Sequence, residues 1–285
     1  MAEYLDGYWT SGDELRLHYR DYAGRDDRLP VVCLHGLTRN ARDFASLADH
    51  IAGERRVIVP ELRGRADSEY AKDSATYNPV QYVEDLNVLL SELAIDRFIS
   101  IGTSLGGLMT FIIAMTMSDR LAGAVINDIG PYIEPSGLAR ISQYVGQGRS
   151  FETWVHAARA LEEAQSTAHP RFQLADWIGM AKRTMALTSN GRIVFDYDMK
   201  IAEPFADIDP NKQVDAWPAI DGLAGKPVLV IRGALSDLFS TDTMAQMLAK
   251  LSDGEGLTLA DVGHAPLLDE PEALAAIDRL LARID

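Results

Sequence analysis

A serine flanked by two glycines is the group in this sequence best suited to nucleophilic chemistry. Residues Gly102–Gly106 read Gly-Thr-Ser-Leu-Gly and follow the apolar run Phe98–Ile101. The next stretch, Leu105–Met117, is apolar and almost free of charge, as expected of a buried helix. A G-x-S-x-G pattern between a strand and a helix predicts a sharp, strained turn that presents the serine hydroxyl at the edge of a sheet. Ser104 is therefore the expected nucleophile.

A histidine and two aspartates are candidates for the groups that would activate this serine. His264 follows the last strand-like run, Leu257–Val262, and so lies at the carboxyl edge of the predicted sheet, where Ser104 also lies. Asp237 follows the preceding strand, which gives the chain order nucleophile, acid, base. We therefore favour Asp237 as the acid that orients the histidine. Asp128 also ends a strand at this edge and stays open as the alternative.

Backbone amides are expected to supply the remaining part of such a site. The turn His35-Gly36-Leu37 follows a buried apolar run and brings a backbone N–H beside the nucleophile. The amides of Leu37 and Leu105 would bind the oxyanion of a tetrahedral intermediate, and that of Leu105 lies at the positive end of a helix dipole. Only backbone groups are needed there, so leucine side chains are compatible with the role.

Apolar strand patterns alternate with helical patterns along most of the chain. This alternation predicts an α/β fold with a doubly wound, mostly parallel sheet of about eight strands. Residues Glu14–Arg20 alternate between polar and apolar, which is typical of an antiparallel strand. We expect this strand to pair with a short strand near Tyr8. The buried strand patterns are Val31–Leu34, Arg56–Val59, Phe98–Ile101, Ala122–Ile126 and Val228–Ile231, and the helical patterns are Ala41–Ala52, Val80–Ala94, Thr241–Leu251 and Pro271–Ile284.

One interval is too long for a single crossover helix. About a hundred residues separate the strand that ends near Asp128 from the strand that begins after Pro227. This interval contains further helical patterns and a segment rich in Asp and Pro. We therefore expect a core formed by residues 1–130 and 219–285, with a helical cap inserted at residues 131–218.

The expected cap carries residues that could form the wall of a substrate pocket, although ordinary packing within the cap is the alternative for each of them. Arg39, two residues after Leu37, could meet a substrate carboxylate, but a solvated surface arginine is the more ordinary interpretation. The aromatic candidates are Trp154, Trp177, Tyr132, Tyr144 and Tyr197.

The composition argues against several classes of partner. The chain has 285 residues and a formal net charge of −15, which repels phosphate backbones and anionic membranes, so neither nucleic acid nor a membrane is expected as a partner. No signal peptide and no membrane-spanning stretch is recognisable, and we expect a cytoplasmic protein. The single cysteine, Cys33, lies in a buried strand. No metal-ligand spacing, P-loop or dinucleotide motif is present, so neither a metal nor a cofactor is expected.

These motifs, in this order, resemble the α/β-hydrolase superfamily over nearly the whole chain. The resemblance implies a capped serine hydrolase of the esterase or enol-lactonase type, with the insertion in the place of the cap. One departure is Ala66, where capped members often carry glycine. The segments that carry the resemblance are His35-Gly36, Arg63–Ser68, Gly102–Gly107, Asp237 and Gly263-His264.

Single residues narrow the resemblance further. Epoxide hydrolases and haloalkane dehalogenases use an aspartate at the position of Ser104. Proline iminopeptidases usually carry Trp at the position of Leu105, and hydrolases of carbon–carbon bonds usually carry Trp at the position of Ala265. The classes of the superfamily that stay compatible with these residues are esterases, lactonases, thioesterases and cofactor-free perhydrolases.

We therefore expect a serine hydrolase that cleaves a carboxylic ester or lactone of a small molecule. Ser104, His264 and Asp237 would form its triad and an acyl-enzyme its intermediate. Thioesterase or perhydrolase chemistry with the same residues is an alternative. A small-molecule receptor on the same fold is a second one.

Overall fold

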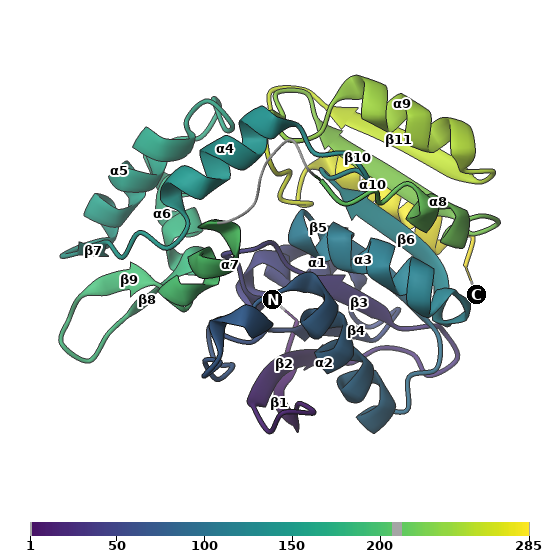
Figure 1. Ribbon diagram of the computed structural model, residues 1–285, viewed down its shortest axis with the longest axis horizontal. Coiled ribbons are helices and arrows are strands. Elements are labelled where there is room, and N and C mark those ends of the chain that lie inside the picture. Colours follow the sequence, from purple (N-terminus) through teal and green to yellow (C-terminus); the bar gives the residue numbers. More distant parts are fainter. Residues whose placement is uncertain (1, 207–212, 285) are drawn as a thin grey trace.

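Strands that are apolar on both faces form the centre of the molecule. The computed structural model describes residues 2–206 and 213–284, and within them one sheet has eight strands in the order β1-β2-β4-β3-β5-β6-β10-β11 (Figure 1). Strand β2 runs antiparallel to both of its neighbours, β1 and β4, and the other neighbouring strands of this sheet pair in parallel. This confirms the predicted mostly parallel sheet of an α/β-hydrolase. The strands are β1 (Tyr4–Thr10), β2 (Arg16–Tyr22), β3 (Val31–Leu34), β4 (Val57–Pro60), β5 (Phe98–Thr103), β6 (Leu121–Asn127), β10 (Val228–Gly233) and β11 (Gly254–Leu259).

The burial of each strand explains its place in the sheet. Every residue of β3, β4, β6 and β10 is buried, because helices cover both faces of a parallel sheet. Strand β11 alternates between buried or half-buried and exposed residues and lies at one edge. Strand β1 pairs with β2 at the other edge, with Tyr8 opposite His18, which confirms the predicted pairing of the alternating strand with a short strand near Tyr8.

Two layers of helices enclose the sheet. Helices α2, α3, α8 and α9 contribute to one apolar core, and α1 and α10 contribute to the core on the opposite face. None of the helices in the described part of the chain has both the length and the apolar character needed to cross a membrane. The helices are α1 (Ala45–Ile51), α2 (Pro79–Glu92), α3 (Leu105–Thr116), α8 (Pro218–Gly222), α9 (Thr241–Lys250) and α10 (Pro271–Leu281).

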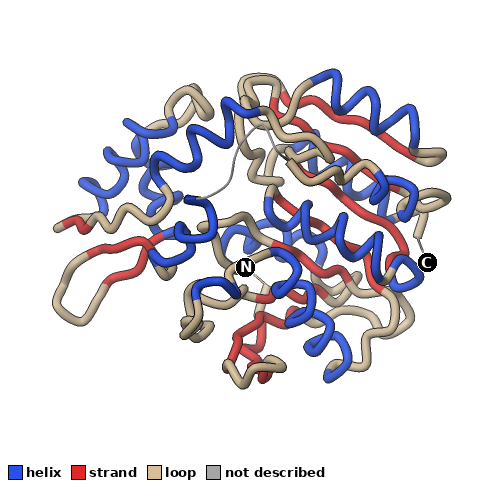
Figure 2. The backbone as a smooth tube through the Cα atoms, viewed as in Figure 1, coloured by secondary structure: helices blue, strands red, loops and turns tan. Residues whose placement is uncertain are grey.

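Residues 131–218, the expected insertion, fold beside this core and are called the insert. It contains helices and also a small antiparallel sheet in the order β7-β9-β8, which the expectation of a helical cap did not include (Figure 2). Residues 207–212 of the expected cap lie outside the described residues. Its elements are α4 (Pro135–Tyr144), β7 (Ser150–Phe151), α5 (Trp154–Gln165), α6 (Leu174–Thr184), β8 (Met185–Leu187), β9 (Ile193–Phe195) and α7 (Glu203–Ala206).

Hydrogen bonds join the insert to the loop that follows β4. The backbone N–H of Asp198 donates to the carbonyl of Gly64 at 2.8 Å, and the N–H of Ala66 donates to the carbonyl of Asp196 at 3.0 Å. The Tyr77 hydroxyl donates to the carboxylate of Asp198 at 2.6 Å. The insert is therefore bonded directly to a loop of the core.

Candidate active site

Ser104 lies at the turn between β5 and α3 in the strained conformation that the motif predicts. Its backbone has φ +53° and ψ −112°, a region that non-glycine residues rarely occupy. The neighbouring glycines allow the close approach of the helix to the sheet. A Cβ at Gly106 would lie 1.9 Å from the carbonyl oxygen of Leu34, and one at Gly102 would lie 2.3 Å from the carbonyl oxygen of Gly106. The turn is therefore compatible only with glycine at these two positions.

His264 lies on the loop after β11 and faces the serine. Its Nε2 is 2.9 Å from the Oγ of Ser104, and its side chain is 9% exposed. The insert holds this loop, because the backbone N–H of Gly263 donates to the carbonyl of Ala168 at 2.6 Å. The structure thus brings together the two residues that the sequence predicts as nucleophile and base.

The acid beside His264 is Asp128 and not the favoured Asp237. The Nδ1 of His264 donates to Oδ2 of Asp128 at 2.8 Å, and the Asp128 side chain is fully buried directly after β6. Its other oxygen accepts the backbone N–H of Gly233 at 2.8 Å. Both carboxylate oxygens are therefore fixed by hydrogen bonds, and the expectation for Asp237 is corrected.

Asp237 instead binds an arginine of the insert. Nη2 of Arg140, on α4, donates to Oδ1 of Asp237 at 2.8 Å, and Nε of Arg140 bonds the other oxygen. This contact holds the pKa of the Asp237 carboxyl below its ordinary value. Strands β6 and β10 are neighbours in the sheet, so both aspartates lie at the same edge. The hydrogen bond of Asp128 to His264 and the contact of Asp237 with Arg140 of the insert separate the two aspartates, and neither contact is visible in the sequence.

The two amides expected to bind an oxyanion are those of Leu105, next to Ser104 in the chain, and of Leu37, in the wall of the cavity that Ser104 lines. Leu105 is the first residue of α3, where backbone N–H groups have no partner within the helix. Leu37 lies in the loop after β3 and lines the same cavity as Ser104. Within the described part of the chain, neither amide donates a hydrogen bond. Both are therefore available to an oxygen atom of a ligand.

Two buried side chains hold the loop that carries Leu37. Arg65 donates from Nε and Nη2 to the Leu37 carbonyl at 3.0 and 2.9 Å. The Nε2 of His35 accepts the N–H of Leu62 at 3.1 Å, so its Nδ1 carries the proton and donates to Gly36 O at 2.8 Å. Burial lowers the pKa of His35 to about 4, which keeps the ring neutral. The sequence motif contains Arg65, but only the structure reveals its contact with Leu37.

A cavity of about 130 Å³ adjoins Ser104 and His264. Of the aromatic candidates, Tyr144 and Tyr197 line it. Trp177 is instead buried in the insert's own apolar core, against which Trp154 packs, and Tyr132 is exposed outside the cavity. Apolar side chains of the insert that line the cavity are Ile141, Phe151, Leu161, Met180 and Phe195.

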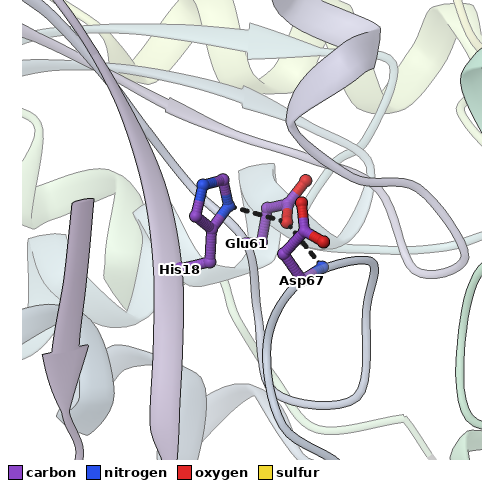
Figure 3. A group of neighbouring side chains, drawn as sticks. All are labelled: His18, Glu61 and Asp67. Atoms are coloured by element: carbon purple, nitrogen blue, oxygen red, sulfur yellow. Dashed lines mark hydrogen bonds and ion pairs between the residues drawn. The ribbon is translucent and has the colours of Figure 1, made fainter. Parts of the chain in front are cut away.

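One group of side chains outside this cavity has the composition of a metal site. Ligand atoms of His18, Glu61 and Asp67 lie within 4.8 Å of one another (Figure 3). Glu61 is already satisfied, because it accepts from His18 Nδ1 at 2.9 Å, from the Asp67 N–H at 3.0 Å and from the Ala41 N–H at 3.1 Å. His18 Nε2 bonds Asp6 at 2.9 Å. These contacts describe an ion pair that fastens β2 to the loop after β4.

A family model described as the alpha/beta hydrolase fold matches residues 30–271. The chain belongs to the α/β-hydrolase family. A 3-hydroxybutyrate-oligomer hydrolase from Cupriavidus necator is 31% identical over 266 residues, which cover 91% of this chain and 90% of that protein. An esterase from Mycobacterium tuberculosis is 25% identical over 87% of this chain and 81% of its own length. The crystal structure of an α/β-hydrolase from Novosphingobium aromaticivorans is 56% identical, with a TM-score of 0.95 over 100% of both chains. The chain is thus a hydrolase with esterase relatives.

Proposed function

We propose that this α/β-hydrolase cleaves carboxylic ester bonds of small molecules through an acyl-enzyme on Ser104. The observation that carries the proposal is the continuous hydrogen-bonded series from Asp128 through His264 to Ser104 at the cavity. A nucleophile bonded to a base, which is in turn oriented by a buried acid, is the arrangement that acyl transfer requires.

The proposed reaction begins when His264 Nε2 takes the proton of Ser104 Oγ while that oxygen attacks the ester carbonyl. The amides of Leu37 and Leu105 stabilise the resulting oxyanion. His264 then gives the proton to the departing alcohol, which leaves an acyl-serine. Water, deprotonated by His264, attacks this acyl group and releases the acid, and the proton returns to Ser104.

Asp128 supports both halves of this cycle in the proposed mechanism. Its carboxylate accepts the Nδ1 proton of His264, which fixes the tautomer whose Nε2 can act as a base. The same negative charge stabilises the imidazolium that forms in each step. The second bond, from Gly233, keeps the carboxylate plane in place.

The relative from Cupriavidus necator guides the choice of substrate. By its name, that protein acts on oligomers of 3-hydroxybutyrate, whose units are joined by carboxylic ester bonds. The cavity of about 130 Å³ is small, which favours short acyl and alcohol groups. We therefore propose short-chain esters, with the lactones of short hydroxy acids as related substrates.

The test is hydrolysis of 4-nitrophenyl butyrate together with labelling by an organophosphate. Ser104→Ala is expected to lower turnover by roughly four to six orders of magnitude and to abolish the label. A variant that hydrolyses the ester at a near wild-type rate would refute the proposal. Labelling of Ser104 without turnover of any ester or thioester would favour a receptor. Added thioester, or acetate with peroxide, tests the thioesterase and perhydrolase alternatives.

A further inference from the structure

Arginines predominate among the charged side chains that line the cavity beside Ser104, although the whole protein is acidic. The chain carries a formal net charge of −15. Among the described residues that line the cavity, however, the ones with permanent charges are Arg39, Arg140, Arg149 and Asp43. An acidic protein that concentrates arginines around its candidate nucleophile creates a local preference for anions.

Arg39 lies beside the reacting groups. It lies two residues after Leu37, on the loop that carries the proposed oxyanion amide. A Cβ built on Gly36 would lie 3.3 Å from Cγ of Arg39 and 3.9 Å from Cβ of Ser104. The two side chains therefore border the same small volume, and a short ligand can reach both.

The guanidinium of Arg39 retains unused hydrogen-bonding capacity. Its Nη1 is buried and has no hydrogen-bond partner among the described residues. The nearest carboxylate, that of Asp43, lies 3.6 Å from Nε, which is too long for a hydrogen bond of ordinary strength. A buried donor without a partner costs free energy, so a ligand that supplies an acceptor there gains affinity.

The other two arginines of the cavity differ from Arg39. The guanidinium of Arg140 is bonded to Asp237, a residue of the core loop after β10. Arg149 is exposed, and its guanidinium lies over the ring of Phe151. Arg39 is therefore the best placed of the three to bind an anionic group of a ligand.

A neighbouring histidine reflects the positive charge of this region. His169 is buried and stacks on Phe172 with ring centroids 4.5 Å apart. Burial, together with the charges of Arg39 and Arg183, lowers the pKa of His169 to about 4. The ring of His169 is therefore neutral and adds no further cation to this region.

From these contacts we infer that Arg39 binds a carboxylate of the substrate, so that the protein acts on short esters that carry a free carboxylate near the scissile bond. This inference rests on the proposed ester hydrolysis at Ser104. A guanidinium and a carboxylate form charge-assisted hydrogen bonds that a neutral group cannot replace. The carboxyl end of a short hydroxy-acid oligomer has this chemistry.

Two matched pairs of esters test the inference. The first pair is 3-(butyryloxy)butanoate and 3-(butyryloxy)butanamide, which differ only in a carboxylate on the alcohol side. The second is monoethyl succinate and ethyl succinamate, which differ in the same way on the acyl side. The measurement is the ratio of kcat/KM for the acid to kcat/KM for the amide. Each ratio is taken on one preparation, so the fraction of folded enzyme cancels.

The wild-type protein is expected to favour the carboxylate in at least one pair by roughly 10- to 100-fold. Arg39→Met should bring that ratio close to unity, and Arg39→Lys should restore part of it. Arg97→Met removes the same charge from an exposed site that does not line the cavity, and it should leave the ratio at the wild-type value.

Two results would overturn the inference while leaving the proposed function intact. One is hydrolysis of both pairs by the wild-type protein without preference for the carboxylate. The other is an Arg39→Met variant that keeps the wild-type ratio. If neither pair nor 4-nitrophenyl butyrate is hydrolysed, the proposed function fails, and the inference fails with it.

Discussion

Ser104, His264 and Asp128 come from three loops far apart in the sequence, and each can be traced to a local cause. The glycines around Ser104 and the glycine before His264 mark turns at strand ends, so the sequence predicts both residues at the edge of the sheet. The choice between Asp128 and Asp237 could not be predicted, because both follow strands at that edge. Contacts with Gly233 and Arg140, formed only in three dimensions, separate the two carboxylates.

Replacement of the two aspartates should distinguish their roles. Asp128→Asn is expected to lower kcat for 4-nitrophenyl butyrate by roughly 10³- to 10⁴-fold, because the amide no longer fixes the histidine tautomer. Asp237→Asn removes a partner of Arg140 and should change kcat by less than about tenfold. Steady-state kinetics on both variants, with thermal unfolding as a check of folding, gives the answer. A larger loss in Asp237→Asn would return the acid role to Asp237.

At the scale of elements, the strands were easier to predict than the insert. Parallel strands with helices on both faces require continuous apolar runs, and such runs are visible in the sequence. The hairpin of β8 and β9 was missed because residues 185–187 continue the helical pattern of α6. Their pairing with Ile193–Phe195 depends on a turn and on burial against the insert's own core. Local periodicity alone does not contain that information.

The junction of β5 and α3 provides a test at this scale. Gly106→Ala places a methyl group 1.9 Å from the Leu34 carbonyl, so the helix or the strand must move. We expect a loss of about 3 kcal/mol or more in the free energy of unfolding, with a loss of activity as Ser104 shifts. Gly12→Ala is the matched control, since nothing lies within 4 Å of its added Cβ. Equal unfolding midpoints in urea for the two variants would contradict the close packing.

Considered as a whole, the molecule is acidic outside and carries arginines around its candidate site. The net charge is visible in the sequence, but the gathering of Arg39, Arg140 and Arg149 around one cavity is not, because two of them belong to the insert. The insert is also bonded to the loops after β4, β10 and β11. Removal of the insert would therefore expose the cavity and release the loop of His264.

The ion pair of His18 and Glu61 makes the stability of the whole protein depend on pH. Hydrogen bonds to Glu61 and Asp6 outweigh burial and raise the pKa of His18 above its ordinary value of 6.5. Its contribution is therefore complete below 6.5 and is lost as the pH rises through the raised pKa. Burial alone would raise the pKa of Glu61, but the same hydrogen bond from His18 lowers it below its ordinary value of 4.5. Its contribution is present above 4.5 and is lost as the pH falls through the lowered pKa.

Substitution of His18 tests this dependence. His18→Gln is expected to cost about 3 kcal/mol in the free energy of unfolding near pH 5.5, because it leaves a buried carboxylate without its cation. The difference from wild type should shrink between pH 5.5 and about pH 9, as the pH rises toward and through the raised pKa of His18. Urea unfolding of both proteins at the two pH values measures it. A difference that stays constant or grows with pH would show that His18 is neutral in the folded protein.

The two aspartates at neighbouring strand ends also bear on how this site could evolve. Strands β6 and β10 are neighbours in the sheet, and an aspartate follows each of them at the edge that carries the histidine. Asp237 already occupies the second position, and the charge of His264 contributes to lowering its pKa. Loss of Arg140 and of Asp128 would leave Asp237 as the remaining acid. Ancestral or laboratory lineages could thus move the acid from one strand to the next by point substitutions, with the fold unchanged throughout.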